Sequence, residues 1–417
     1  MSEIKDESIY VIDGLRTPIG KYHGKLSHLS IVELATPLIQ TLLERSRLTQ
    51  TDVSHLFLGS VYVANVGQNP ARQCAIRAGL PDTIALNINM VCLSGLQAVH
   101  LACQTLRTDP DAQIILAIGA ESMSNVPYYL DHYRFGAYSG DGVVIDGLLK
   151  DGLLCAFTNQ HMIVCTEGYL DDSDITVEEV DAAAIRSHRL ASSKNSFRKE
   201  ILPIETKDGW LDRDQDILTA PEARLSREAP VFRRLPASIR GTCSSDQEGC
   251  YLDTIKNPRL KVSSCSRLGD GASALILATG RECKRRGLRP IAEILRYVEV
   301  NTKPEYYISS INKAVEKLLQ KTGIEAAEID LFEINEAFAC VGPMFTRFFS
   351  IPMDKINISG GSVAIGHPLG CTGNRLVLSM IHNLRETGTE LGIVSMCAGG
   401  GTGGAMLVRA IHDESEP

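Results

Sequence analysis

The 417-residue sequence lacks several features that mark whole classes of protein. No apolar run reaches the roughly 18 residues that a transmembrane helix needs. There is no basic surplus of the kind that nucleic-acid-binding proteins normally have, because 42 Lys and Arg stand against 50 Asp and Glu, a net charge of −8. With 44% hydrophobic and 22% charged residues, the composition instead predicts an ordinary folded chain of two or three domain-sized units.

Targeting signals are absent as well. The first residues, MSEIKDESIYVIDG, have neither the basic start and apolar stretch of a signal peptide nor the Arg-rich, acid-poor composition of a transit peptide. The last residues, DESEP, are not the SKL tail of a peroxisomal protein. We therefore expect a cytoplasmic protein with no membrane and no nucleic acid among its partners.

Metal-binding patterns are also missing, although the sequence holds 12 cysteines. There is no C-x-x-C pair and no His at zinc spacing from two Cys residues, so no metal site is predicted. Without a secretion signal, we expect reduced thiols, most of them buried as small apolar residues. One or two of them remain candidates for a chemical role.

Two parts of the chain show the same order of predicted elements. In the N-terminal part, a short strand at ALNINM leads to a helix over about 92–106 and a strand over about 113–119. In the C-terminal part, a Gly-rich turn leads to a helix over about 370–385, followed by the strands LGIVSM and AMLVRAI. The repetition predicts two similar α/β halves that face each other.

We place these halves at 1–275 and 276–417, with an inserted loop domain at about 120–260 in the first half. The insert has a different composition, with clustered tyrosines, many charges and the basic stretch RLSREAPVFRRLPASIR. That stretch is either a solvated face or a site for a polyanionic small ligand. Its basic residues are Arg224, Arg227, Arg233, Arg234 and Arg240.

Cys92 lies where the predicted strand meets the predicted helix. A thiol at a helix N-terminus faces the positive end of the helix dipole, which lowers its pKa and favours the thiolate. A sharp turn at this junction would also present the side chain in the manner of a nucleophile elbow. Taken alone, Cys92 is either such a nucleophile or a buried structural cysteine.

Four further residues are candidates for a site. His367 follows glycines and precedes a proline in GGSVAIGHPLGCTG. Taken alone, it is either a rigidly held general base or a structural histidine. Cys397 precedes the glycine-rich turn AGGGTGG. A dinucleotide-binding loop would lead into a helix, and no helix is predicted after this turn, so we reject that interpretation. We expect instead that backbone N–H groups of the turn point toward an oxyanion. Asn335 and Glu336 end an apolar strand, either as capping residues or as hydrogen-bonding groups of a site.

Together these blocks carry a family resemblance. Four blocks resemble the active-site blocks of the thiolases, in the same order, and the likeness extends from about residue 8 to 410. Within the family the match is best to the acetyl-CoA acetyltransferases that form acetoacetyl-CoA. The four blocks are NMVCLSGLQAV, NEAFA, GGSVAIGHPLGCTG and CAGGGTGGAM, and further matches are RTPIGKYHGKLS, VGQNPARQ and DGLLCAFTNQHM.

The resemblance implies a reversible Claisen condensation of two acetyl-CoA to acetoacetyl-CoA and CoA, through an acetyl-cysteine. It implies that Cys92 is the nucleophile, that His367 activates it and that Cys397 is the acid/base for the second acetyl-CoA. The backbone N–H groups of Cys92 and Gly399 would form one oxyanion hole. His367 and a water held by Asn335 would form the other.

The resemblance also implies a fold and binding residues. The fold class is α/β, the five-layered αβαβα thiolase fold of two similar halves with an inserted loop domain. His161 and Met162 would line the acyl and pantetheine pocket, and Ser266 would contact coenzyme A. Arg224, from the basic stretch rather than from the resemblance, is a further candidate for coenzyme A binding. We expect coenzyme A thioesters as substrates, no metal or other cofactor, and a homo-oligomer, a dimer or a homotetramer.

The sequence departs from the family where coenzyme A and the acyl chain should bind. The family's Asn-Ala-Ser-Gly loop reads Ser264-Cys265-Ser266-Arg267, Ile163 replaces a Gly, and residues 243–262 resemble an insertion. Ile163 predicts a narrow acyl pocket. Two alternatives stay open: a degradative 3-ketoacyl-CoA thiolase of broad chain length, favoured less by the His-Met pair, and a thiolase-like protein that binds acyl-CoA without turnover.

Overall fold

A large mixed sheet forms the centre of the computed structural model, which describes residues 4–136, 139, 141–193, 197–242 and 249–412. In the described part the sheet has ten strands in the order β4-β3-β5-β10-β1-β11-β14-β13-β12, with β2 added to β10. The strands are β1 Ile9–Arg16, β2 Gly20–Lys21, β3 His55–Gly59, β4 Ile84–Ile88, β5 Ile114–Ser122, β10 Gly269–Thr279, β11 Ala292–Asn301, β12 Leu331–Ile334, β13 Leu391–Ala398 and β14 Thr402–Ala410.

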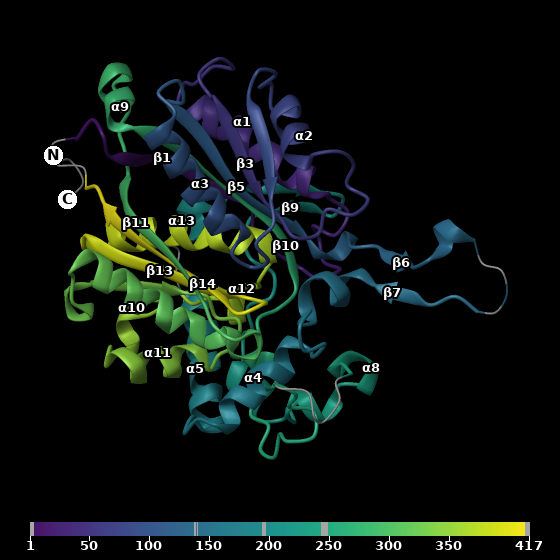
Figure 1. The fold of residues 1–417 in the computed structure, drawn as a ribbon. Coiled ribbons are helices and arrows are strands. Elements are labelled where there is room, and N and C mark those ends of the chain that lie inside the picture. Colours follow the sequence, from purple (N-terminus) through teal and green to yellow (C-terminus); the bar gives the residue numbers. More distant parts are fainter. Residues whose placement is uncertain (1–3, 137–138, 140, 194–196, 243–248, 413–417) are drawn as a thin grey trace.

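The sheet divides into two parts at the junction of β1 and β11. β1 pairs with β10 along its whole length, but with β11 only at Tyr10 and Val11. Figure 1 shows β3, β5, β10 and β1 on one side of this junction and β11, β14 and β13 on the other. The pairs β3–β4, β3–β5 and β12–β13 are parallel, so each part ends in a parallel strand pair.

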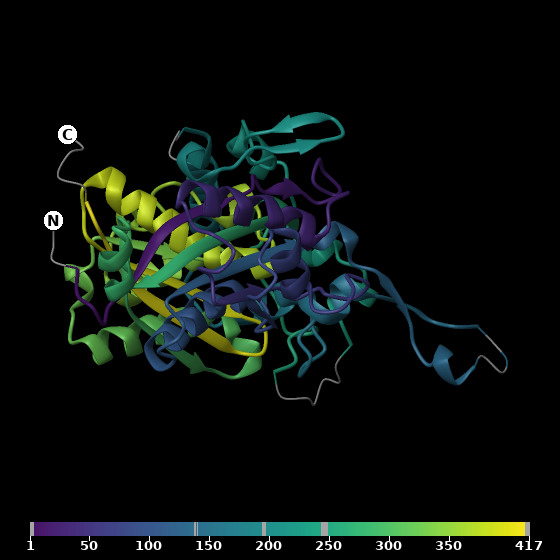
Figure 2. The same ribbon diagram turned by 90° about the horizontal axis from the view of Figure 1, so that it is seen from above.

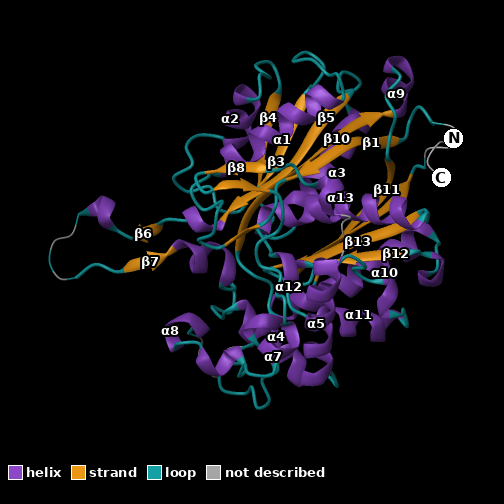
Figure 3. Cartoon of the chain, turned by 180° about the vertical axis from the view of Figure 1, so that it is seen from behind, coloured by secondary structure: helices purple, strands orange, loops and turns teal. Residues whose placement is uncertain are grey.

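Two helices fill the space between the parts, α3 (Ser94–Thr108) and α13 (Leu369–Thr387). Figure 3 shows them between the two groups of strands. One apolar cluster joins their side chains to strands of both parts, for example Leu96, Leu378, Leu275 and Met406. α13 packs against neighbours on nearly every side, and most of its residues are buried. Apolar and small side chains therefore occupy most of its circumference.

Outer helices complete five layers. α1 (Ile31–Arg45) and α2 (Pro70–Arg77) pack on the free face of the first strand group. α10 (Ser310–Thr322) and α11 (Val341–Phe349) pack on that of the second. The predicted αβαβα arrangement of two α/β halves is confirmed. The predicted helices over 92–106 and 370–385 are also confirmed, with ends shifted by one or two residues, as is usual where the terminal residues depend on capping contacts.

The segment between β5 and β10 contributes no described strand to the central sheet. It holds a hairpin, β6 with β7, that projects far from the body in Figures 1 and 2. The limits of the inserted loop domain, about 120–260, and the boundary between the two halves, at 275/276, stay predictions. The elements of the segment are β6 Tyr128–Leu130, β7 Val144–Asp146, α4 Met162–Asp171, α5 Val177–Ser193, α6 Phe197–Glu200, β8 Ile204–Thr206, β9 Gly209–Leu211, α7 Pro221–Leu225 and α8 Ala237–Arg240; two short helices lie elsewhere, α9 Gly280–Arg286 and α12 Ser362–Ile365.

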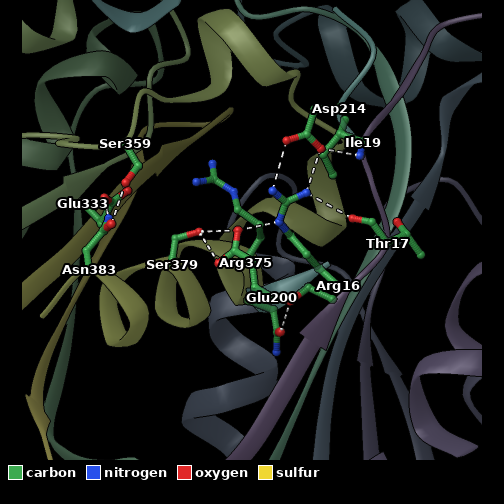
Figure 4. Close-up of polar contacts among 12 residues, drawn as sticks. Arg16, Thr17, Ile19, Glu200, Asp214, Glu333, Ser359, Arg375, Ser379 and Asn383 are labelled. Atoms are coloured by element: carbon green, nitrogen blue, oxygen red, sulfur yellow. Dashed lines mark hydrogen bonds and ion pairs between the residues drawn. The ribbon is translucent and has the colours of Figure 1, made fainter. Parts of the chain in front are cut away.

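A buried ion-pair cluster ties this segment to the core. Arg16, at the end of β1, donates from Nε to Glu200 at 2.6 Å and from both terminal nitrogens to Asp214 at 2.7 and 3.0 Å. Glu200 also accepts from Ser379 of α13, and Figure 4 shows these side chains converging beside Arg375. A buried guanidinium that lost one carboxylate partner would cost several kcal/mol, so this cluster fixes how residues 197–216 lie on the core.

Two findings concern membrane association and the oxidation state of the cysteines. No helix in the described ranges is long and apolar enough to cross a membrane. Ten of the twelve cysteines are free thiols, whereas Cys250 is disulfide-bonded, so the expectation of reduced thiols is wrong at Cys250. Within the insertion predicted at 243–262, residues 243–248 lie outside the described residues.

Candidate active site

One cavity of about 240 Å³ brings together residues from both halves of the chain. Residues of the inserted segment close its other side. Seven of the nine residues that the sequence singled out line this cavity: Cys92, His161, Met162, Ser266, His367, Cys397 and Gly399. Asn335 lies directly behind the lining, and Arg224 lies away from it.

Cys92 is presented by a strained turn between β4 and α3. Val91, the residue before it, has a φ of 50°, a left-handed conformation that β-branched residues rarely adopt. The turn is held by its neighbours, since Val91 N–H donates to Asn89 Oδ1 at 2.9 Å and Ser94 Oγ–H donates to the carbonyl of Val91 at 2.6 Å. The sharp turn expected of a nucleophile is present.

The direction of the Cys92 pKa differs from the sequence prediction. Burial raises the pKa of this thiol to about 12, although the backbone N–H groups of Gly399 and Cys92 favour the thiolate. The prediction of a lowered pKa is therefore wrong for the free protein, because removing the sulfur from water outweighs the backbone dipoles. α3 also starts two residues later, at Ser94. The thiol is protonated at neutral pH and needs a base.

His367 is built as a neutral base. It follows Gly366, whose φ is 105°, and its N–H donates to the carbonyl of Arg267 at 2.7 Å. Its Nδ1 lies 2.7 Å from the hydroxyl of Thr372, which donates its own hydrogen to the carbonyl of Pro368 at 2.9 Å. The Thr372 oxygen is therefore the acceptor of Nδ1–H, which leaves the lone pair on Nε2.

Burial and the nearby Arg375 charge keep His367 unprotonated. Burial is the larger cause, and together they lower the pKa of the imidazole to about 3. At neutral pH the cavity thus holds a protonated thiol and a neutral imidazole. Such a pair can transfer a proton from sulfur to Nε2 at the moment of attack without separating charge beforehand.

Asn335 ends β12 and faces His367. Its Nδ2 lies 3.4 Å from His367 Nε2, and its Oδ1 accepts from Ser362 Oγ at 2.8 Å. The neighbouring Glu336 instead accepts hydrogen bonds from Ser187 at 2.6 Å and from Asn357 at 3.0 Å. The sequence left both residues either as capping residues or as hydrogen-bonding groups of a site. The contacts of Asn335 fit a place in the site, whereas those of Glu336 fit support of the surrounding loops.

Cys397 and Gly399 lie at the end of β13. Burial raises the pKa of the Cys397 thiol well above its usual range, and the nearby Cys92 raises it further. Gly399 directs its backbone N–H toward the sulfur of Cys92. The turn continues into strand β14, paired Cys397 with Gly403, so no helix follows and the rejected dinucleotide-binding reading has no structural basis.

Another part of the cavity wall comes from the start of α4. His161 caps this helix by accepting from Ile163 N–H at 3.1 Å, and burial lowers its imidazole pKa to about 4. Met162 and Ile163 follow on the cavity surface. Ser266 lines the cavity from the loop before β10, where its N–H donates to the carbonyl of Ala337 at 3.1 Å.

Arg224 is not brought to the cavity. It lies on α7 with 60% of its side chain exposed and forms an ion pair with Glu228 at 2.7 Å. This geometry matches the solvated-face interpretation of the basic stretch. Contact between Arg224 and coenzyme A stays a prediction.

Sequence reasoning missed several residues of the site. Apolar and aromatic lining residues such as Leu153, Tyr307 and Phe338 gave no signal, since any core residue has the same composition. Glu121 at the end of β5 was also missed: it accepts hydrogen bonds from the backbone N–H groups of Val61, Tyr62 and Gly370 at 2.9–3.0 Å. Its carboxylate thereby joins the β3 loop to the start of α13, and burial raises its pKa to about 7.

No group of three His, Cys, Asp or Glu residues in the described part of the chain is arranged to hold a metal ion. Three thiols (Cys92, Cys265 and Cys397) and two imidazoles (His161 and His367) line the cavity, and the Asn335 amide lies directly behind His367. This set is suited to acyl transfer through a covalent thioester, since it offers a nucleophile, a base and oxyanion donors.

Comparison with known proteins agrees with this assignment. Residues 9–239 match the family description "Thiolase, N-terminal domain" and residues 288–410 match "Thiolase, C-terminal domain". The chain is 35% identical to an acetyl-CoA acetyltransferase of Schizosaccharomyces pombe, over 97% of this chain and 99% of the relative. It is 36% identical to the cytosolic acetyl-CoA acetyltransferase of Gibberella zeae, over 97% and 98%.

Solved structures show the same fold. A thiolase from Ascaris suum in complex with coenzyme A is 31% identical, with a TM-score of 0.86 over 97% of this chain and all of that one. The acetyl-CoA acetyltransferase of Bacillus anthracis is 30% identical, with a TM-score of 0.87 over 97% and 99%. The chain belongs to the thiolase family.

Proposed function

We propose that this protein is an acetyl-CoA acetyltransferase that joins two acetyl-CoA into acetoacetyl-CoA and CoA, and runs the reverse thiolysis. One observation carries the proposal: Cys92, His367 and Cys397, far apart in the sequence, line a single cavity with the backbone of Gly399. Relatives of nearly the same length that bear this enzyme name support it.

In the first half-reaction, Cys92 attacks the thioester carbonyl of acetyl-CoA. Its proton moves to Nε2 of His367, and the departing CoA sulfur takes that proton and leaves as the free thiol. The negative charge on the carbonyl oxygen is stabilised by the backbone N–H groups of Cys92 and Gly399, a contribution of ~3 kcal/mol for one such donor. The product is acetyl-Cys92.

In the second half-reaction, the Cys397 thiol gives its proton to Nε2 of His367, and the resulting thiolate takes a proton from the methyl carbon of a second acetyl-CoA. The carbanion attacks the acetyl group on Cys92, the Cys92 sulfur leaves and takes the proton from His367, and acetoacetyl-CoA forms. Because burial raises the pKa of the Cys397 thiol, this thiol also needs a base, and the neutral imidazole of His367 supplies it.

Intact-protein mass spectrometry tests the proposal. After incubation with acetyl-CoA, the wild type should gain one acetyl group, and Cys92→Ala should gain none. Cys397→Ala should still be acetylated but should lose condensation by at least ~10²-fold, because only the second half-reaction uses this thiol. A folded wild type that takes no acetyl group contradicts the assignment, and full turnover of Cys397→Ala contradicts the two-cysteine mechanism.

Chain length separates this function from its alternatives. Ile163 is buried in the cavity wall, which favours a short acyl group over the broad chain-length thiolase. A series of 3-ketoacyl-CoA substrates decides: equal thiolysis of long chains identifies the broad-range enzyme. A non-catalytic acyl-CoA-binding protein would bind acetyl-CoA without forming the acetyl-cysteine.

The remaining expectations are part of the proposal. The substrates are coenzyme A thioesters, with no metal or other cofactor. We propose a cytoplasmic protein, which the name of one relative, a cytosolic acetyl-CoA acetyltransferase, supports. We propose a homo-oligomer, in keeping with the exposed apolar residues Ile84 and Leu86 on edge strand β4 and Phe135 on the projecting hairpin. Light scattering after gel filtration distinguishes a monomer, which would contradict this, from a dimer or homotetramer.

A further inference from the structure

A short chain of hydrogen bonds connects His367 to a buried arginine on the far side of Asn335. Ser362, the first residue of α12, is fully buried. Its hydroxyl donates to Oδ1 of Asn335 at 2.8 Å and lies 3.1 Å from Nη2 of Arg375, which donates to it. On its other side the Asn335 amide faces His367 Nε2 at 3.4 Å.

The donor and acceptor roles in this chain follow from Arg375. A guanidinium carries only donors, so the Ser362 oxygen accepts from it and the Ser362 hydrogen must point elsewhere. The acceptor within reach is Oδ1 of Asn335. The amide is therefore placed with its oxygen toward Ser362 and its N–H toward His367, an orientation that only the hydrogen-bond network can establish.

The reverse orientation of the amide would place two lone pairs against each other. Nε2 of His367 carries a lone pair, because Nδ1–H donates to Thr372. A flipped Asn335 would set its oxygen against that lone pair and its N–H₂ against Ser362. It would also remove the N–H donor from the side of the cavity where the second oxyanion forms.

Arg375 has no competing hydrogen bond that would release Ser362. It lies on α13, buried between the two strand groups. Among the described residues, its Nη2 donates to Ser362 and its Nη1 has no hydrogen-bond partner. Figure 4 shows its guanidinium beside that of Arg16, whose own donors are taken by Glu200 and Asp214.

We propose that Ser362, held by Arg375, is a positioning residue that fixes the Asn335 amide with its N–H toward His367 and so keeps an oxyanion donor in place. The proposal rests on the acetyltransferase function above. It assigns a reaction-specific role to a buried serine that touches neither the substrate cavity nor either catalytic cysteine.

A double-mutant cycle tests it, with kcat and KM for thiolysis of acetoacetyl-CoA as readouts. Ser362→Ala should lower kcat about tenfold and leave KM within about twofold, because only transition-state stabilisation is lost. In an Asn335→Ala background the same change should alter kcat by less than about twofold, since Ser362 then has no amide to orient.

Ser359→Ala is the matched control, because it also removes a buried hydroxyl bonded to an asparagine, Asn383, at 2.5 Å. It should leave kcat unchanged. Equal losses from Ser362→Ala in both backgrounds, or no loss in the wild-type background, overturn the positioning role. If Ser362→Ala does not fold, Ser362→Cys replaces it in the cycle. Acetylation of wild-type Cys92 reports separately on the proposed function, so the two failures are distinguishable.

Discussion

The hydroxyl of Thr372 lies 2.7 Å from Nδ1 of His367 and gives its own hydrogen to the carbonyl of Pro368. The two residues lie five positions apart, at the loop-to-helix junction where α13 begins. Because Thr372 accepts from Nδ1–H, the lone pair of His367 lies on Nε2, the atom that takes the Cys92 proton in the proposed mechanism. One side chain outside the cavity lining thus sets the tautomer of the base.

Thr372→Val should lower kcat about tenfold or more, because the imidazole loses the acceptor that selects its tautomer and orientation. KM should change little, since Thr372 does not line the cavity. Steady-state thiolysis kinetics measure both values. Thr372→Ser keeps the hydroxyl and should retain most of the activity; a valine variant with wild-type kcat would remove the tautomer argument.

Alkylation of Cys92 by iodoacetamide should be nearly independent of pH between about pH 6 and pH 9 in the free protein. The pKa of His367 lies near 3 and that of Cys92 near 12, so neither group changes protonation in this range and the base assists throughout. In His367→Ala the rate should rise about tenfold per pH unit, because only the free thiolate reacts. Peptide mapping identifies the labelled cysteine, and an inflection near neutral pH in the wild type would contradict both pKa values.

Ile163→Gly should widen the range of acyl chains. The side chain lies on the cavity wall beside Met162, and its removal leaves space for additional methylene groups, each of which is worth ~0.8 kcal/mol when buried. Thiolysis of a six-carbon 3-ketoacyl-CoA should increase severalfold relative to acetoacetyl-CoA. An unchanged ratio in a folded variant would show that another wall limits the chain.

Glu121→Gln should remove part of the pH dependence of stability. Burial raises the pKa of folded Glu121 from 4.5 to about 7, so the folded state holds this proton more tightly than the unfolded state. Its contribution is fully present below about pH 4.5 and is lost as the pH rises through about 7, a fall of ~3 kcal/mol in the free energy of unfolding.

Urea unfolding at pH 5 and pH 8 measures the effect as the difference between wild type and Glu121→Gln. Other buried carboxyls such as Glu333, whose pKa burial raises to about 8, are present in both proteins and cancel. A stability difference that does not change with pH would contradict the raised pKa.

The sequence by itself carried the resemblance to the thiolases, and the αβαβα architecture was implied by that resemblance. Short motifs at a predicted turn, a glycine-bounded histidine and a glycine-rich strand end singled out Cys92, His367 and Cys397, and the structure places all three in one cavity. The helices α3 and α13 followed from their apolar patterns.

Only the tertiary structure decided the electrostatics and the support of the site. The sequence predicted a lowered pKa for Cys92 from its place before a helix, but the desolvation that raises it comes from elements distant in the chain. The roles of Thr372, Ser362 and Glu121 depend on which lone pairs and N–H groups face each other across loops. Local sequence does not encode those contacts, because they exist only once the two halves pack around α3 and α13.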